Sequence, residues 1–177
     1  MNVQSVLQQL DSWHEFAKPQ HLSESEYLEL YKGLVREEWK EFQDSEAIGN
    51  IVKEACDVIV VCWPLITHGT GHHMKIHHAM SNAVKSVLHE MNINWFQALA
   101  KVNESNFSKL ILAGEVDEAS DYFAKMGIDV RIESVGDAYF AAYSTHDQTV
   151  NGDDLAADKL LKPHSYFEID ETTEWWL

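Results

Sequence analysis

The chain has 177 residues, of which 45% are hydrophobic and 24% are charged, a composition typical of one folded domain with a hydrophobic core. These values exclude a disordered tail protein. The formal net charge of −16 at pH 7 disfavours nucleic acid and anionic membranes as partners, because both bind clustered basic residues.

Two helices are predicted in the first part of the chain from hydrophobic residues that recur at three- and four-residue steps. The first covers residues 3–17, and Pro19 is expected to stop it. Ser23 and Glu26 have the spacing of a capping box, which predicts that a second helix begins there. This second helix is expected to run to about Asp44.

A third helix is predicted over about residues 51–66, after Gly49 and Asn50 break the pattern. The segment is apolar on nearly all sides, so we expect it to lie at the centre of the fold. Pro64 is expected to kink it near its end.

Three further helices are predicted between the third helix and Gly127. A turn at residues 68–71 precedes a helix over about residues 76–91. The next helix covers residues 95–113, with Gly114 directly behind it. A short helix then covers residues 117–126.

The periodicity changes after Gly127 from a helical to an alternating pattern. Alternation around residues 130–132 and 139–143, with Gly136 and Asp137 between them, predicts one β-hairpin. The last thirty residues are expected to form an irregular tail that packs on the helical body.

The expected fold is therefore all-α, a helical bundle with a small C-terminal β-hairpin and an irregular tail. We expect a single domain over residues 1–177, with a helical core of about residues 1–126 and the hairpin and tail over about residues 127–177. 

A reducing cytoplasm is the expected location. The first residues lack the basic start and apolar stretch of a secretory signal. The longest apolar run, Val58–Ile66, is shorter than the roughly 20 residues that a membrane helix needs. Cys56 and Cys62 form neither a CxxC pair nor a disulfide framework.

Four acidic residues on the second and third predicted helices are expected to point toward the core. At about 100° per residue, Glu38 and Glu41 continue the apolar stripe of their helix, and its basic residues fall on the opposite side. Glu54 and Asp57 share a face with the apolar residues of the third helix. The link between the helices is short, which predicts antiparallel neighbours and one cluster of four carboxylates.

Such a cluster requires neutralisation, because buried carboxylates repel one another and raise their own pKa values. Ion pairs with Lys53 or Arg36 are one solution. For the set of four, a hard metal ion such as Mg²⁺ or Mn²⁺ is favoured, since these ions prefer oxygen ligands. A di-iron bundle is disfavoured, because it uses Glu-x-x-His motifs and no Glu in this chain has His three positions later.

The acidic motifs resemble the signature of the MazG-like all-α nucleoside triphosphate pyrophosphohydrolases, which is EExxE followed by ExxD. Residues 37–41 read EEWKE and residues 54–57 read EACD. Residues 102–109, VNESNFSK, are similar to the V-x-x-SNxSK segment of phage and bacterial members. Residues 159–163, KLLKP, with Tyr166, are similar to their GKxLKxxxY tail.

The resemblance implies Mg²⁺-dependent hydrolysis of a (d)NTP between its α- and β-phosphates, giving a nucleoside monophosphate and pyrophosphate, with Mn²⁺ as a substitute metal. It implies that Glu38, Glu41, Glu54 and Asp57 are the metal ligands. Glu37 would hold a further ion or orient the attacking water. Some phage members, of the MazZ type, act on dGTP or other purine deoxynucleotides such as dATP.

The resemblance also implies where the nucleotide binds. Asn106 and Lys109 match residues expected near the phosphates. Lys159 and Lys162 would close over the phosphates or would simply lie on the surface. Aromatic residues of the first helix would stack on the base or would belong to the core; the candidates are Trp13 and Phe16, with Trp39 of the second helix.

Three further expectations complete the reading of the sequence. Family members generally form dimers or tetramers, so a homotetramer or homodimer is expected, and the apolar third helix would suit a subunit contact. His72, His73, His77 and His78 either bind Zn²⁺ or form a solvated or interface cluster, and no catalytic role is assigned to them. The alternative to an enzyme is a non-catalytic helical interaction protein with a structural metal cluster.

Overall fold

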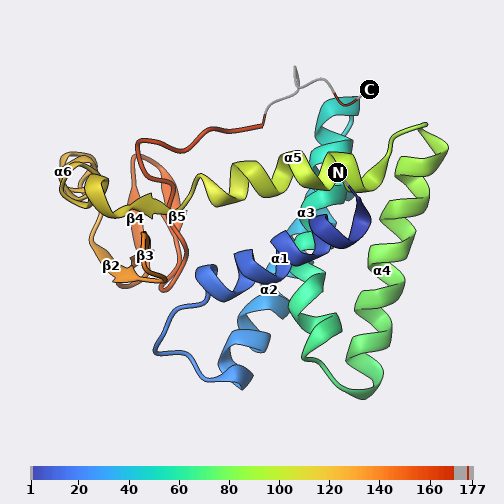
Figure 1. Cartoon of the computed structure of the whole chain (residues 1–177), viewed down its shortest axis with the longest axis horizontal. Helices are drawn as coiled ribbons and strands as arrows, with labels where there is room; N and C mark the ends of the chain where they lie inside the picture. The colour runs from blue at the N-terminus through green and yellow to red at the C-terminus, as the bar shows by residue number, and fades with distance from the viewer. Residues whose placement is uncertain (1, 170–174, 176–177) are drawn as a thin grey trace. The chain divides into compact units, whose positions relative to one another are not determined.

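The computed structural model describes residues 2–169 and residue 175 (Figure 1). It is mostly helical, with 61% of residues in helices and a small antiparallel sheet toward the C-terminus. The predicted helical fold with a C-terminal hairpin is confirmed at this level. None of the described helices combines the length and hydrophobicity needed to cross a membrane.

The chain divides into two compact units that interleave in sequence. The helical unit comprises Met1–Asp11, Leu22–Asn103 and Ile169–Leu177. The mixed unit comprises Ser12–His21 and Glu104–Glu168. The expectation of a single domain over residues 1–177 stays a prediction.

The helical unit is built around helix α3 (Ile48–Thr67). Helices α2 (Glu24–Asp44) and α4 (Gly71–Glu90) both pack along α3. Most α3 side chains are buried, which confirms the central position predicted from their hydrophobicity. Helices α1 (Val3–Ala17) and α5 (Trp95–Phe107) contribute residues to both units.

Hydrogen bonds fix both ends of the α1 segment that belongs to the helical unit. The indole Nε1 of Trp63 donates to Asp11 Oδ1 at 2.6 Å. Near the start of α1, Asn103 Nδ2 donates to the carbonyl oxygen of Val6 at 3.4 Å. 

Helix α2 begins with the predicted capping box. The Ser23 side chain accepts a hydrogen bond from the backbone of Glu26, and the Glu26 carboxylate accepts one from the Ser23 backbone at 2.9 Å. These bonds satisfy two of the backbone N–H groups that a helix start otherwise leaves unpaired. The predicted end of the helix at Asp44 is also confirmed.

Two predicted helix starts are too late. Helix α3 begins at Ile48 and contains Gly49 and Asn50, where a break was expected. Gly49 is buried, so packing offsets the roughly 1 kcal/mol by which glycine disfavours a helix. Helix α4 begins at Gly71, because its exposed first turn needs no hydrophobic periodicity to be helical. 

Pro64 lies inside α3, and the kink expected there stays a prediction. The helix continues to Thr67, and the backbone N–H of His68 donates to the Pro64 carbonyl oxygen at 2.9 Å. Three residues therefore follow the proline within the helix before it stops.

The mixed unit contains a three-stranded antiparallel sheet in the order β1-β3-β2. Its strands are β1 (Ile111–Leu112), β3 (Tyr139–Ser144) and β2 (Val130–Ser134). Helix α6 (Val116–Met126) packs against it through Phe123. Its C-cap is Gly127, whose φ of +72° favours glycine. 

The predicted hairpin is confirmed as β2 and β3, and two neighbouring expectations are wrong. The helix predicted over residues 95–113 ends at Phe107, because Ile111 and Leu112 pair with Phe140 and Tyr139 as a strand. Part of the expected irregular tail forms a second hairpin, β4 (Gln148–Val150) with β5 (Asp153–Leu155). 

The capping box gives a prediction about stability. Ser23→Ala is expected to lower the free energy of unfolding by about 1 kcal/mol, because it removes the side-chain acceptor at the start of α2. Urea unfolding followed by circular dichroism measures the change. Gln43→Ala, at an exposed position of the same helix, serves as the control and is expected to change stability by less than about 0.5 kcal/mol. Equal effects of the two substitutions would contradict the prediction.

Candidate functional site

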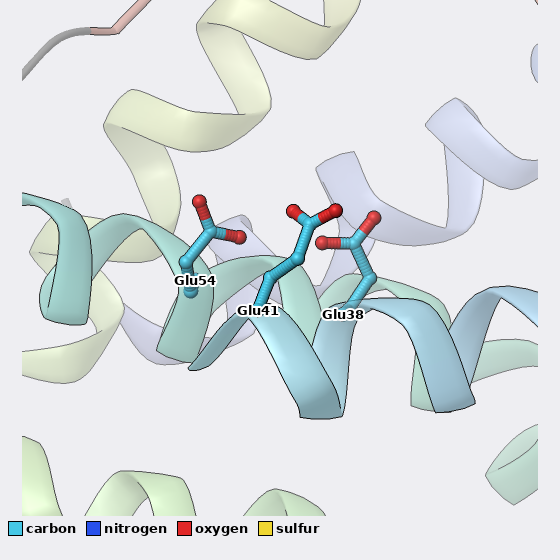
Figure 2. Close-up of side chains that lie close together, drawn as sticks. All are labelled: Glu38, Glu41 and Glu54. Atoms are coloured by element: carbon cyan, nitrogen blue, oxygen red, sulfur yellow. The ribbon is translucent and has the colours of Figure 1, made fainter. Parts of the chain in front are cut away.

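Three carboxylates from α2 and α3 converge in the helical unit. Glu38 and Glu41 come from successive turns of α2, and Glu54 comes from α3 (Figure 2). One carboxylate oxygen of each residue lies within 4.8 Å of the others. The two helices pack against each other and are joined by a link of only three residues, which brings their acidic faces together.

Asp57 lies beside this group of three and is joined to it through a lysine. The Lys53 ammonium contacts Glu54 Oε1 at 2.8 Å and Asp57 Oδ2 at 3.0 Å. The predicted ion pair of the acids with Lys53 therefore exists for two of the four carboxylates. 

The three acids of the EEWKE motif differ in whether they belong to the group of three carboxylates. Glu41 is exposed and Glu38 is half-buried, and both belong to the group of three. Glu37 is exposed and lies outside that group. Among the described residues, neither Glu38 nor Glu41 has a Lys, Arg or His partner within ion-pair distance.

The carboxylates perturb one another electrostatically. Burial, followed by the negative charges of Asp57, Glu41 and Glu54, raises the pKa of Glu38 to about 8. Burial also raises the pKa of Glu54, although Lys53 opposes this shift. For Lys53, burial disfavours the charged form, but Asp57 and Glu54 outweigh it and raise the pKa of the ammonium. 

The site has the chemistry of a hard-metal centre. The three members of the group are carboxylates, the donors that Mg²⁺ and Mn²⁺ prefer. The second oxygen of Glu54, Oε2, is buried and has no hydrogen-bond partner. Four carboxylates share one lysine, so Lys53 neutralises only part of the charge. The residues therefore fit a divalent cation, with Glu38, Glu41 and Glu54 as its nearest ligands.

A second group of predicted site residues comes together within the mixed unit. The Lys109 ammonium donates to Asn106 Oδ1 at 2.7 Å and lies 5.7 Å from the Trp13 ring centroid. It also lies 6.0 Å from the ring of Tyr166, over which Lys162 Nζ lies at 4.7 Å. The two lysines, the two aromatic residues and Asn106 form what we call the lysine–aromatic cluster: Trp13, Asn106, Lys109, Lys162 and Tyr166.

Three predicted binding residues lie outside the lysine–aromatic cluster. Phe16 packs edge-on against Phe107, with ring centroids 6.3 Å apart, and also contacts the ring of Tyr139. Lys159 is exposed, and its backbone rather than its side chain bonds to the sheet, through a hydrogen bond from Ser144 N. Trp39, in the helical unit, stacks obliquely on Phe42 of its own helix. 

The histidine-rich segment at the start of α4 is mostly exposed. His72, His73 and His78 are exposed, whereas His77 is buried and its Nδ1 lies 2.7 Å from the carbonyl oxygen of His73. In the described part of the chain, the group of three glutamates is the only set of three or more His, Cys, Asp or Glu residues close enough to share an ion. 

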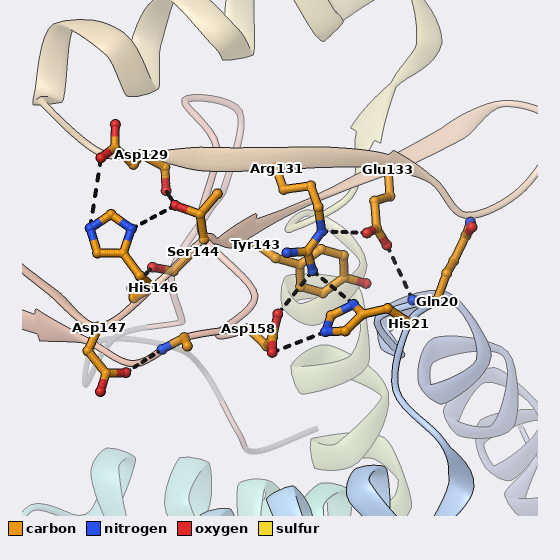
Figure 3. Close-up of polar contacts among 12 residues, drawn as sticks. Gln20, His21, Asp129, Arg131, Glu133, Tyr143, Ser144, His146, Asp147 and Asp158 are labelled. Atoms are coloured by element: carbon orange, nitrogen blue, oxygen red, sulfur yellow. Dashed lines mark hydrogen bonds and ion pairs between the residues drawn. The ribbon is translucent and has the colours of Figure 1, made fainter.

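A polar network in the mixed unit was not predicted from the sequence. Arg131 donates to Asp158 Oδ1 at 3.0 Å and also to Glu133 (Figure 3). The His21 ring contacts both Arg131 and Asp158: its Nδ1 lies 3.2 Å from Arg131 Nη2, and its Nε2 lies 3.2 Å from Asp158 Oδ2. The Arg131 guanidinium also lies 5.6 Å from the ring centroid of Tyr143. The one sequence signal was local: Arg131 and Glu133 are two residues apart on a strand and so share a face. 

Comparison with known proteins finds no relative, since the chain matches no family model, no curated protein and no solved structure. Function is therefore inferred from the residues and from the resemblance of their motifs.

The raised pKa of Glu38 predicts a pH-dependent stability difference in metal-free buffer with EDTA. Between about 4.5 and about 8 the folded state keeps a proton that the unfolded state releases, so wild-type stability falls as the pH rises through this window. The variant Glu38→Gln has no titratable group at this position, so it escapes this loss. As the pH rises from about 4.5 to about 8, its free energy of unfolding is expected to increase by about 2 kcal/mol relative to that of the wild type, after allowance for solvent screening. Urea unfolding at the two ends of the window measures the gain.

The control for this experiment is Glu104→Gln, an exposed carboxylate on α5. Its stability difference from the wild type is measured at the same two pH values and serves as the baseline. If Glu38→Gln behaves in the same way as this control, the electrostatic description of the cluster is wrong.

A metal-binding prediction follows from the same geometry. At constant ionic strength, MgCl₂ at a hundredfold excess over its Kd is expected to stabilise the protein by about 2.7 kcal/mol, which is a rise of about 5–10 °C in Tm. The Glu54→Gln variant should show no rise in Tm on addition of MgCl₂, and the Glu104→Gln variant should show the same rise as the wild type. Each variant is compared with its own Tm without metal. An equal response of both variants would place the ion elsewhere. 

Proposed function

We propose that this protein is a Mg²⁺-dependent nucleotide pyrophosphohydrolase, which cleaves a (d)NTP to a (d)NMP and pyrophosphate, with Mn²⁺ as a substitute metal. The observation that carries the proposal is the convergence of Glu38, Glu41 and Glu54. These residues belong to the two motifs, EEWKE and EACD, that resemble the signature of MazG-like pyrophosphohydrolases. 

The carboxylate cluster suits this reaction. A bound divalent cation neutralises phosphate oxygens, polarises the phosphoryl group and lowers the pKa of a coordinated water. Glu38, Glu41 and Glu54 would hold it, and Asp57 would join them as the cation competes with Lys53 for the carboxylates. Glu37, exposed on α2, is available to orient the attacking water or a further ion.

The lysine–aromatic cluster has the chemistry needed to bind a nucleotide. Its two ammonium groups, on Lys109 and Lys162, can contact phosphate oxygens. The rings of Trp13 and Tyr166 offer flat apolar faces on which a base can stack. The amide of Asn106 already orients the Lys109 ammonium at 2.7 Å. 

The resemblance also guides the choice of substrate and assembly. Because the motifs after residue 100 are similar to those of phage members, including the MazZ type, purine deoxynucleotides such as dGTP or dATP are the proposed substrates. A cytoplasmic homodimer or homotetramer is the proposed form. 

One observation favours a second candidate, a non-catalytic interaction protein with a structural metal cluster. Lys53 already ion-pairs with both Glu54 and Asp57 within α3, so the protein itself neutralises part of the cluster's charge, as expected of a cluster with a structural role. In this case the protein would bind Mg²⁺ but would not turn over nucleotides. 

The decisive assay presents the eight common ribo- and deoxyribonucleoside triphosphates with Mg²⁺ and identifies the products by anion-exchange chromatography. We expect monophosphate and pyrophosphate from at least one purine deoxynucleotide, with none formed in EDTA. Glu54→Gln is expected to lower activity by about 100-fold or more, since loss of a direct ligand should cost at least as much as loss of the groups that orient the ligands. Glu104→Gln should match the wild type. 

Two outcomes would contradict the proposal. Inactivity across the whole panel, together with a Mg²⁺-dependent rise in Tm, supports the non-catalytic candidate. Release of inorganic phosphate or of intact triphosphate would identify a different class of phosphohydrolase.

A further inference from the structure

Helix α4 presents an apolar stripe to solvent. Its buried residues are partly polar: His77, Ser81, Val84 and Leu88. Five exposed or half-buried apolar residues share one side of the helix, and we call them the α4 stripe: Ile76, Ala79, Met80, Ala83 and Val87. Ile76, for example, is 41% exposed. Met74 is also exposed, but it lies on another side of the helix.

The α4 stripe is continuous along three turns of the helix. At about 100° per residue its five members fall within an arc of about 100°, which is the width of a face that packs on another element. Single exposed hydrophobic residues are ordinary, but five on one arc indicate a contact surface. 

The charge of α4 sets it apart from the other helices. No Asp or Glu occurs from Gly71 to His89, although the chain contains 29 acidic residues. The remaining described α-helices, α1, α2, α3, α5 and α6, each carry at least one Asp or Glu within their length. Two molecules with a net charge of −16 repel each other, so α4 is the helical surface on which a second copy meets the least repulsion.

The stripe is complementary to itself when two copies run antiparallel. With a two-fold axis near residues 81 and 82, Ile76 falls opposite the partner's Val87, and Ala79 falls beside the partner's Ala83, where small side chains allow close approach. The single carboxylate of the helix, Glu90, then falls beside the partner's His72 rather than beside another acid. 

We propose that α4 forms an antiparallel, two-fold symmetric contact with α4 of a second copy of this chain. The contact buries the α4 stripe of both copies and pairs His72 with Glu90 at each end. It does not depend on the proposed hydrolysis, because the observations that support it lie outside the carboxylate cluster. 

The first test measures the molar mass of the wild-type chain by sedimentation equilibrium in buffer without nucleotide or metal. We expect a dimer or a larger even assembly. Ile76→Glu places a charge in the stripe and should weaken the α4 contact at least 100-fold. Met74→Glu makes the same kind of change at a 37%-exposed position about 160° away around the helix, and it should leave the mass unchanged.

The second test fixes the orientation and introduces no charge. Ile76→Cys and Val87→Cys are purified separately and oxidised alone or as a mixture; the natural residues Cys56 and Cys62 are buried. In the antiparallel contact, identical positions lie about 16 Å apart along the axes, whereas position 76 of one copy meets position 87 of the other. The mixture should form a disulfide-linked heterodimer, and each variant alone should not.

Each alternative outcome overturns the proposal. A wild-type chain that is monomeric at all concentrations leaves the stripe for a different partner. An assembly that Ile76→Glu does not weaken uses another surface. Homodimers of each cysteine variant alone, with none between them, would indicate a parallel contact. None of these results affects the nucleotide assay, so the two proposals fail separately.

Discussion

The helical unit depends on one electrostatic constraint: four carboxylates and one lysine share the contact between α2 and α3. Glu54 is buried with an unpaired oxygen, and Glu38 titrates near 8. Burial of uncompensated charge is costly, so this arrangement is stable only if protons or cations reduce the negative charge. A protonated carboxyl group is a poor metal ligand, so of these two a divalent cation, as proposed, would neutralise the cluster and leave its carboxylates ionised.

Local signals predicted the helices better than their ends. The capping box at Ser23 and Glu26 fixed the start of α2 because it satisfies backbone groups within four residues. Gly49 misled the prediction, because its burial against neighbouring elements outweighs its low helix propensity. Ile111 and Leu112 continued a helical pattern in sequence but pair with a strand almost thirty residues later, and no local pattern encodes that pairing.

The convergence of the glutamates at the candidate site could be predicted from the sequence, but the side-chain pairings could not. Helical periodicity and the short link between α2 and α3 predicted that the acidic faces of the two helices meet, and carboxylate oxygens of Glu38, Glu41 and Glu54 lie within 4.8 Å of one another. Asp57 pairs with Lys53 and lies outside that group of three. This arrangement depends on side-chain rotamers, which sequence spacing does not determine. The network of Arg131, Asp158 and His21 joins three distant segments, so it required the fold to be known.

Helix α4 shows why hydrophobic periodicity leaves an ambiguity that only packing resolves. Its apolar residues cover two adjacent stripes, and the one that includes Val84 and Leu88 faces its own unit together with the polar side chains of His77 and Ser81. A surface helix normally buries its apolar residues and exposes its polar ones, whereas α4 buries a histidine and a serine and exposes an isoleucine. The arrangement becomes consistent if the second stripe also has a partner. In a chain this acidic, that partner must meet a face without carboxylates, and α4 of another copy satisfies this condition.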